Sequence, residues 1–158
     1  MGAGIIPVAI HNGKVYLLFG KEVQDGKWSD FGGGRENNET PFKTAIREGC
    51  EELSGFLGCK TKLAKDVKTN LILALRVKTY NTYIFQTAYD ANLPEYYRNH
   101  FLFVKSKFPH LINTDGNFEK SEIAWLSLEE LKRKRLSFRP FYREVVDAII
   151  ENKEILQS

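Results

Sequence analysis

The sequence predicts an α/β domain in which a mixed sheet lies between helices. Three observations support this. Strand-like and helix-like runs intermix along the chain, 158 residues suit one domain, and 42% hydrophobic with 27% charged residues is an ordinary globular composition. We therefore expect residues 1–158 to form a single domain with an insertion at about 91–118.

The chain is expected to open with a hairpin. Residues 5–10 form an apolar, strand-like run, Asn12-Gly13 is a strong hairpin-turn signal, and residues 15–19 form the return strand. Because Pro7 has no backbone N–H, the first strand is expected to lie at a sheet edge or to begin after Pro7.

A polar, glycine-rich connection then leads to a helix expected from Thr40 to about Leu53. Thr40 is a good N-cap and Pro41 suits the first helical position. Ser54-Gly55 is a typical helix stop. Gly49 lies on the apolar side of this helix, so its missing side chain predicts close packing against a bulky neighbour.

The second half of the chain predicts more strands and helices around the irregular, aromatic-rich insertion, inside which one short helix is expected. In order, the expected elements are strands at 70–78 and 82–89, the insertion at 91–118, a short strand at 122–126, a helix opened by the capping box of residues 127–130, and a last helix from 140 to about 153.

Cysteine content and charge limit the compartment and the ligands. Cys50 is expected in the core and Cys59 in a loop without a partner, because two cysteines are too few for a disulfide framework; a reducing, cytoplasmic compartment follows. No apolar run approaches the length of a membrane span. The net charge of +3 suits anionic ligands without requiring nucleic acid.

Three carboxylates converge on the polar side of the helix expected at 40–53. Glu48, Glu51 and Glu52 are spaced i, i+3 and i+4, so they repel one another. A hard divalent cation, Mg²⁺ or Mn²⁺, would relieve that repulsion, since it prefers oxygen ligands. The alternative is a solvated acidic face without a ligand.

A wider pattern favours the metal site. The spacing G-x5-E-x7-R-E-x2-E-E resembles the Nudix box, the signature of Nudix hydrolases, and six fixed positions match by chance on the order of 10⁻⁶ times per chain of this length. The preceding residues 28–34, WSDFGGG, also resemble the segment that leads into the box, including that of members from large DNA viruses. The resemblance implies a Nudix-like α/β/α sandwich with a mixed central sheet. The matching positions are Gly33, Glu39, Arg47, Glu48, Glu51 and Glu52.

The resemblance also implies a Mg²⁺-dependent enzyme that cleaves the diphosphate linkage of nucleoside diphosphate derivatives. Glu48, Glu51, Glu52 and the backbone of Gly33 would hold the metal. Glu48, Glu52, Arg47 and a distal acid would act in catalysis, and Glu119 is preferred over Glu122 for that acid because it lies in a loop. The substrate-binding candidates are Lys21, Arg35, Glu39, Glu122, Tyr96 and Phe101.

Two alternatives stay open at this level. The basic run 132–135 could bind RNA or an inositol polyphosphate, although such a run is more often a solvated helix end. The substrate would then be capped RNA or a diphosphoinositol polyphosphate, or the chain would be a non-catalytic binding module. The aromatic residues at 96–108 could stack on a base or form a small core of their own. A nucleotide-type substrate is the favoured partner, and the oligomeric state, a homodimer included, stays open.

Overall fold

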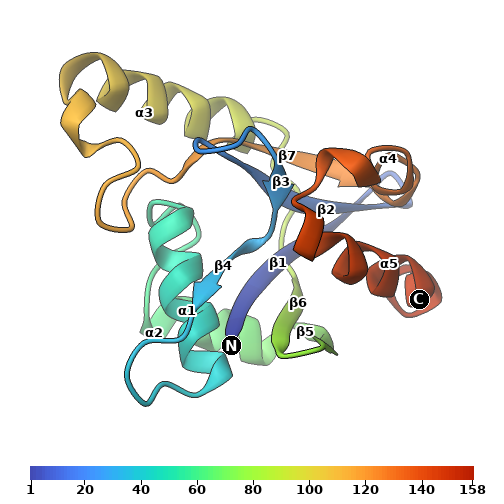
Figure 1. The fold of residues 1–158 in the computed structure, drawn as a ribbon. Helices are drawn as coiled ribbons and strands as arrows, with labels where there is room; N and C mark the ends of the chain where they lie inside the picture. Colours follow the sequence, from blue (N-terminus) through green and yellow to red (C-terminus); the bar gives the residue numbers. More distant parts are fainter.

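The computed structural model describes residues 1–158. A twisted mixed sheet forms the centre, with helices α1 and α2 on one side and α4 and α5 on the other (Figure 1). The strands are β1 Gly2–His11, β2 Lys14–Glu22, β3 Trp28–Ser29, β4 Phe31–Gly34, β5 Leu71–Val77, β6 Tyr80–Gln86 and β7 Lys120–Ser127. The helices are α1 Pro41–Glu52, α2 Thr61–Thr69, α3 Leu93–Lys107, α4 Leu128–Arg133, α5 Arg143–Glu151 and α6 Lys153–Gln157, and short 3₁₀ turns lie at Pro109–Leu111, Arg135–Ser137 and Pro140–Tyr142.

Strand β1 organises the sheet because it pairs on both sides. It runs parallel to β6 from Gly2 to Val8, while its other side pairs antiparallel first with β4 and then with β2. Alternate residues of β1 enter different cores. Ile5 packs in the core beneath α1, α2 and α3, and Ile6 packs in the core beneath α4, α5 and α6, as the two-residue period of a strand requires.

The expectation that Pro7 marks an edge strand is wrong, and the pairing explains why. Ile5 is opposite Phe31 of β4, Val8 is opposite Leu17 of β2, and Pro7 lies between these two partners. The antiparallel partner of β1 changes from β4 to β2 at this point, so no antiparallel partner requires a backbone N–H from residue 7. A proline is therefore compatible with a central strand at this position.

The expected helix at 40–53 is confirmed as α1, and the hairpin and the capping box of α4 are confirmed as well. Two segments differ. Residues 61–69 form α2, for which no helix was expected; its N-cap, Lys60, makes no side-chain capping bond. The segment at 91–118 contains a helix of 15 residues, α3, in place of a short one. Its Tyr97 belongs to the core beneath α1, so this segment does not form a core of its own.

The cysteine expectation is also wrong. Cys50 and Cys59 form a disulfide with their Cα atoms 4.8 Å apart. The chain between them turns back through left-handed backbone angles at Ser54, Gly55 and Gly58, which sequence spacing alone does not reveal. The cysteine count therefore no longer supports a reducing compartment. None of the helices combines the length and apolarity needed to span a membrane.

The predicted close packing at Gly49 is confirmed. A Cβ atom at this position would lie 2.5 Å from Cδ1 of Ile5, which is fully buried. Helix α1 can therefore lie directly against β1 only because this residue has no side chain.

We predict that Gly49→Ala destabilises the fold, because overpacking costs about 1–3 kcal/mol and outweighs a gain in helix propensity of about 1 kcal/mol. In an Ile5→Ala background the same change fills the vacated space and should stabilise. Urea unfolding of the four proteins measures both effects. An identical effect of Gly49→Ala in both backgrounds would contradict the packing argument.

Candidate active site

Helix α1 presents the predicted carboxylates, and local signals fix where it begins and ends. The Thr40 side chain accepts a hydrogen bond from the Lys43 N–H at 3.2 Å, and Pro41 occupies the first turn. The helix ends at Leu53, and the Gly55 N–H then bonds to the Cys50 carbonyl at 3.0 Å. These ends place the three box glutamates on the last two turns.

Strand β4 lies close against this end of the helix because it consists largely of glycine. A Cβ atom on Gly33 would come within 2.6 Å of the Glu48 carboxylate, so any other residue would displace that side chain. The Gly32 N–H donates to Oε1 of Glu52 at 2.7 Å. At Gly34 a Cβ would meet nothing within 4 Å, so close approach is a property of Gly33 and not of its neighbour.

Arg47 connects the loop before the helix to the helix itself. Its Nε and Nη2 donate to the two oxygens of Glu39 at 2.8 and 2.9 Å, and its Nη1 donates to Oε1 of Glu48 at 2.9 Å. Nη2 also donates to the Gly34 carbonyl at 2.9 Å. The bidentate bond lowers the pKa of Glu39 to about 2. Arg47 and Glu39 therefore hold Glu48 in position, and Glu39 is not free to bind a substrate.

The box carboxylates are short of counter-charge. Burial raises the pKa of Glu48, of Glu51 and, most strongly, of Glu52, and neighbouring carboxylates raise each further. Arg47 opposes the rise at Glu48 and Glu51, whose side chains are 13% and 36% exposed. An added cation would stabilise the ionised forms of all three.

The two candidates for the distal acid occupy different surroundings. The charge of Glu119 contributes to the raised pKa values of Glu48 and Glu51, so Glu119 lies within electrostatic reach of the box. Glu122 instead faces Lys21 across the β2–β7 ladder, with 3.8 Å between Oε1 and Nζ. The loop before β7 therefore carries Glu119 within electrostatic reach of the box, whereas Glu122 and Lys21 pair with each other.

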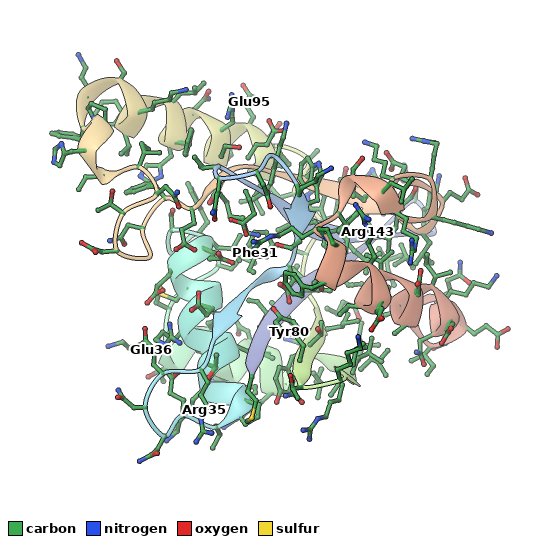
Figure 2. The ribbon with its side chains drawn as sticks, in the orientation of Figure 1. Phe31, Arg35, Glu36, Tyr80, Glu95 and Arg143 are labelled. Carbon is green, nitrogen blue, oxygen red and sulfur yellow. A yellow bond between two sulfur atoms is a disulfide. The ribbon has the colours of Figure 1, made fainter.

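The remaining substrate-binding candidates do not gather at the box. Arg35 is exposed in the connection from β4 to α1, at the lower edge of the view in Figure 2. Tyr96 is 53% exposed on α3, whereas Phe101 is only 4% exposed beneath the Arg98 guanidinium. The expectation that Phe101 stacks on a substrate is therefore wrong, because its ring is used in packing α3.

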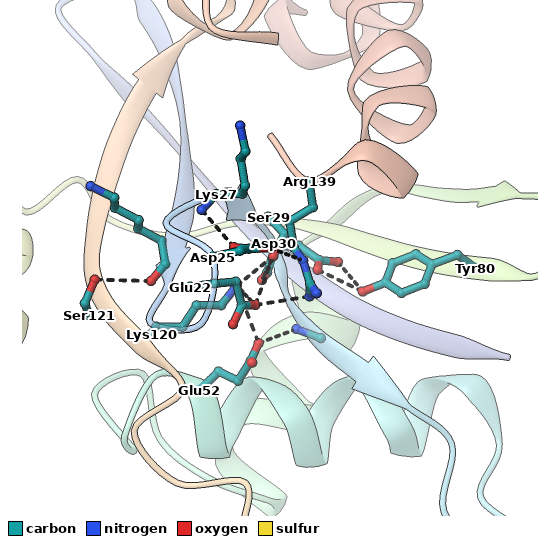
Figure 3. A network of polar contacts seen from close by, with 12 residues as sticks. Glu22, Asp25, Lys27, Ser29, Asp30, Glu52, Tyr80, Lys120, Ser121 and Arg139 are labelled. Carbon is teal, nitrogen blue, oxygen red and sulfur yellow. Dashed lines mark hydrogen bonds and ion pairs between the residues drawn. The ribbon is translucent and has the colours of Figure 1, made fainter. Parts of the chain in front are cut away.

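A buried polar network lies directly behind Glu52 (Figure 3), and the sequence analysis did not find it. Lys120 Nζ lies 2.9 Å from Glu22 Oε1, 2.7 Å from Ser29 Oγ and 3.9 Å from Glu52 Oε1, and its side chain is fully buried. Burial lowers the pKa of Lys120, but Glu52 and Glu22 outweigh burial and raise it, so Lys120 stays charged.

Asp30 completes this network at the junction of β3 and β4. The Tyr80 hydroxyl lies 2.8 Å from both of its carboxylate oxygens, and Asp30 is 1% exposed. Burial raises the pKa of Asp30 to about 7, against the opposing effect of Lys120. The buried ammonium of Lys120 therefore serves Glu22, Glu52 and Asp30, and Arg139 adds a second cation only at Glu22, 3.6 Å from its Oε1. Nothing in the sequence around Lys120 indicates this role, since a lysine at the start of a strand is usually solvated.

The donor set suits a hard cation although it does not form a closed cage. No three acidic, histidine or cysteine side chains stand together as a ready metal site. The available donors near Gly33 are nevertheless all oxygens, which Mg²⁺ prefers. Glu51 is the most exposed of the box carboxylates, and its contact with Arg47 is the longest of that residue's ion pairs, at 3.7 Å. It is the donor freest to turn toward a metal.

Comparison with known proteins agrees with this geometry. A family model described as the NUDIX domain matches residues 1–149. The chain belongs to the NUDIX domain family. Among solved structures, a Nudix hydrolase of M. smegmatis, RenU, superimposes with a TM-score of 0.56 and 16% identity over 97% of this chain and 85% of that one. The Ap4A hydrolase of C. elegans gives 0.54 and 16% over 98% and 96%.

A viral relative matches in part. The uncharacterized protein L534 of Acanthamoeba polyphaga mimivirus is 38% identical over 87 residues, which are 51% of this chain and 28% of that protein. This chain therefore aligns with less than a third of that relative. The predicted family and the α/β fold with a mixed sheet are confirmed.

We predict that Lys120→Met destabilises the fold by about 3–5 kcal/mol, the usual cost of removing one partner from a buried ion pair. Replacing Glu22 as well, in Lys120→Met/Glu22→Gln, removes one of the two carboxylates that lose Lys120 as a partner and should recover part of that loss. Equilibrium denaturation measures both variants. Equal free energies of unfolding for Lys120→Met and the wild type would show that the Lys120–Glu22 ion pair does not stabilise the fold.

Asp30 should make stability depend on pH. Because its pKa is higher in the folded chain than in the unfolded one, the folded state binds more protons between about pH 4 and 7, and its contribution to stability falls as pH rises through that window. Asp30→Asn should flatten that fall in the melting temperature. An unchanged slope in the variant would assign the pH dependence to other groups.

Proposed function

We propose that this Nudix enzyme is a Mg²⁺-dependent hydrolase, with Mn²⁺ as the alternative ion, that cleaves the diphosphate linkage of nucleoside diphosphate derivatives. The observation that carries the proposal is the complete acid set of one helix face. Glu48, Glu51 and Glu52 meet the glycine backbone of β4, and Glu119 lies within electrostatic reach. A nucleotide-type substrate forms part of the proposal.

The chain's own residues would do the following. Glu48, Glu51, the free oxygen of Glu52 and the backbone at Gly33 would hold the cation, which when bound neutralises the diphosphate and lowers the pKa of the attacking water. Arg47 holds Glu48 through the bonds described above and leaves its second oxygen available. Gly32 holds Oε1 of Glu52 and so fixes the direction of the other oxygen.

We assign to Glu119 the acceptance of the proton from the attacking water. No lysine or arginine lies within 4 Å of its carboxylate, and the oxygens of Glu48 and Glu52 that Arg47 and Gly32 leave free are assigned to the cation. A base must have an oxygen available for the water it deprotonates.

A binding module that uses the basic run 132–135 has less support. Within that run Arg135 is bonded at 2.7 and 2.9 Å to both carboxylate oxygens of Asp147, so it stabilises the packing of α5. Because the charge of Arg135 is paired with Asp147, less positive charge of this run is available to bind RNA or an inositol polyphosphate.

We expect Glu119→Gln to lower kcat by about 100-fold or more, the usual loss for a general base, and Glu52→Gln to abolish measurable turnover. The assay is product release from a panel of nucleoside diphosphate sugars, dinucleoside polyphosphates, oxidised nucleotides, capped RNA and diphosphoinositol polyphosphates with Mg²⁺. Glu95→Gln, an exposed change on α3, is the matched control. Equal turnover by Glu52→Gln and the wild type would refute the assigned chemistry.

A further inference from the structure

A groove separates helix α1 from helix α2, on a side of α1 that the proposed chemistry does not use. Its volume is about 620 Å³, within the range of small-molecule sites. At 100° per residue, Ile46 and Cys50 of the groove point away from Glu48 and Glu52, while Glu51 lies between the two sets and borders both. The groove is therefore a neighbour of the box and not part of it.

The walls of the groove combine an apolar strip with free positive charge. Phe42, Ile46 and Ala64 line it, and Lys43, Lys60 and Lys68 surround them. None of these three lysines has a carboxylate within 4 Å, whereas Lys62 on the same helix pairs with Asp66 at 2.7 Å. These three lysines without carboxylate partners surround an apolar strip. The groove therefore complements a ligand that has an anionic group and a flat apolar group.

Two contacts fix the walls in place. The disulfide from Cys50 to Cys59 joins α1 to the residue before Lys60, and so holds the end of the groove closed. The ammonium of Lys68 lies 5.2 Å from the centre of the Phe42 ring, which places a cation directly over the apolar strip. The groove therefore has a defined shape without a ligand.

We propose that this groove binds a nucleoside polyphosphate, with its phosphates at Lys43, Lys60 and Lys68 and its base against Phe42, Ile46 and Ala64. Phosphate oxygens form charge-assisted bonds with lysine, and a base has the flat apolar face that the strip needs. The ligand is either a separate nucleotide or the far end of a long substrate that reaches across Glu51.

The test uses the full chain and a hydrolysis-resistant probe, adenosine 5′-(β,γ-methylene)triphosphate, in EDTA, so that binding does not depend on the metal or on turnover. We expect saturable binding by calorimetry and amide shifts in α2 and the first half of α1. Lys60→Ala/Lys68→Ala should weaken binding about tenfold. Lys62→Ala/Lys65→Ala, on the same helix outside the groove, removes the same charge and should weaken it less than twofold.

Equal weakening by the two double variants would overturn the proposal, since it would show unspecific attraction to positive charge. Amide shifts confined to residues outside α1 and α2 would overturn it as well. Hydrolysis assays with Mg²⁺ distinguish whether the groove binds a separate nucleotide or the far end of the substrate. A competitive rise in KM that the probe causes in the wild type and not in Lys60→Ala/Lys68→Ala identifies the far end of the substrate, and a change in kcat alone identifies a separate nucleotide. Absence of hydrolysis would refute the proposed function and leave the binding result intact.

Discussion

The site depends on how closely the glycine backbone of β4 and β1 approaches helix α1. Gly33 leaves room for the Glu48 carboxylate, Gly32 donates to Glu52, and Gly49 lets the helix lie on Ile5. The contacts at Gly33 and Gly49 require that a side chain be missing. A side chain at Gly33 would displace the Glu48 carboxylate, and one at Gly49 would push helix α1 away from Ile5 of β1.

That close approach crowds negative charge, and two cations limit its cost. Arg47 neutralises the outer part of the cluster through Glu39 and Glu48, and buried Lys120 serves the inner part through Glu22 and Glu52. Both cations are side chains of the protein, so they are present at all times. The raised pKa values of the box glutamates show that this compensation is incomplete, which is the property expected of a site that binds a further cation.

The sequence predicted those parts of the molecule that are governed by neighbours along the chain. Thr40 and Pro41 define the start of α1 locally, and the spacing of the box glutamates follows from helix geometry. The edge-strand prediction from Pro7 was wrong because a proline fits here only where the neighbour of β1 changes from β4 to β2, and that change involves residues far along the chain. Lys120 and Asp30 gave no signal, since their burial arises from strands far apart in sequence. The Cys50–Cys59 pair depends on the path of the loop between them.

The divergence of β1 and β2 explains why a polar network occupies the interior. Once the two strands separate beyond Val8 and Leu17, β3 and β4 run between them, and the junction at Asp30 lies where no regular ladder continues. Side-chain bonds from Tyr80 to Asp30 and from Lys120 to Ser29 hold this junction in place. The same Lys120 lies 3.9 Å from Glu52. The group that joins the two halves of the sheet thus also fixes a box carboxylate, so the opening of the sheet and the orientation of the site are one structural feature.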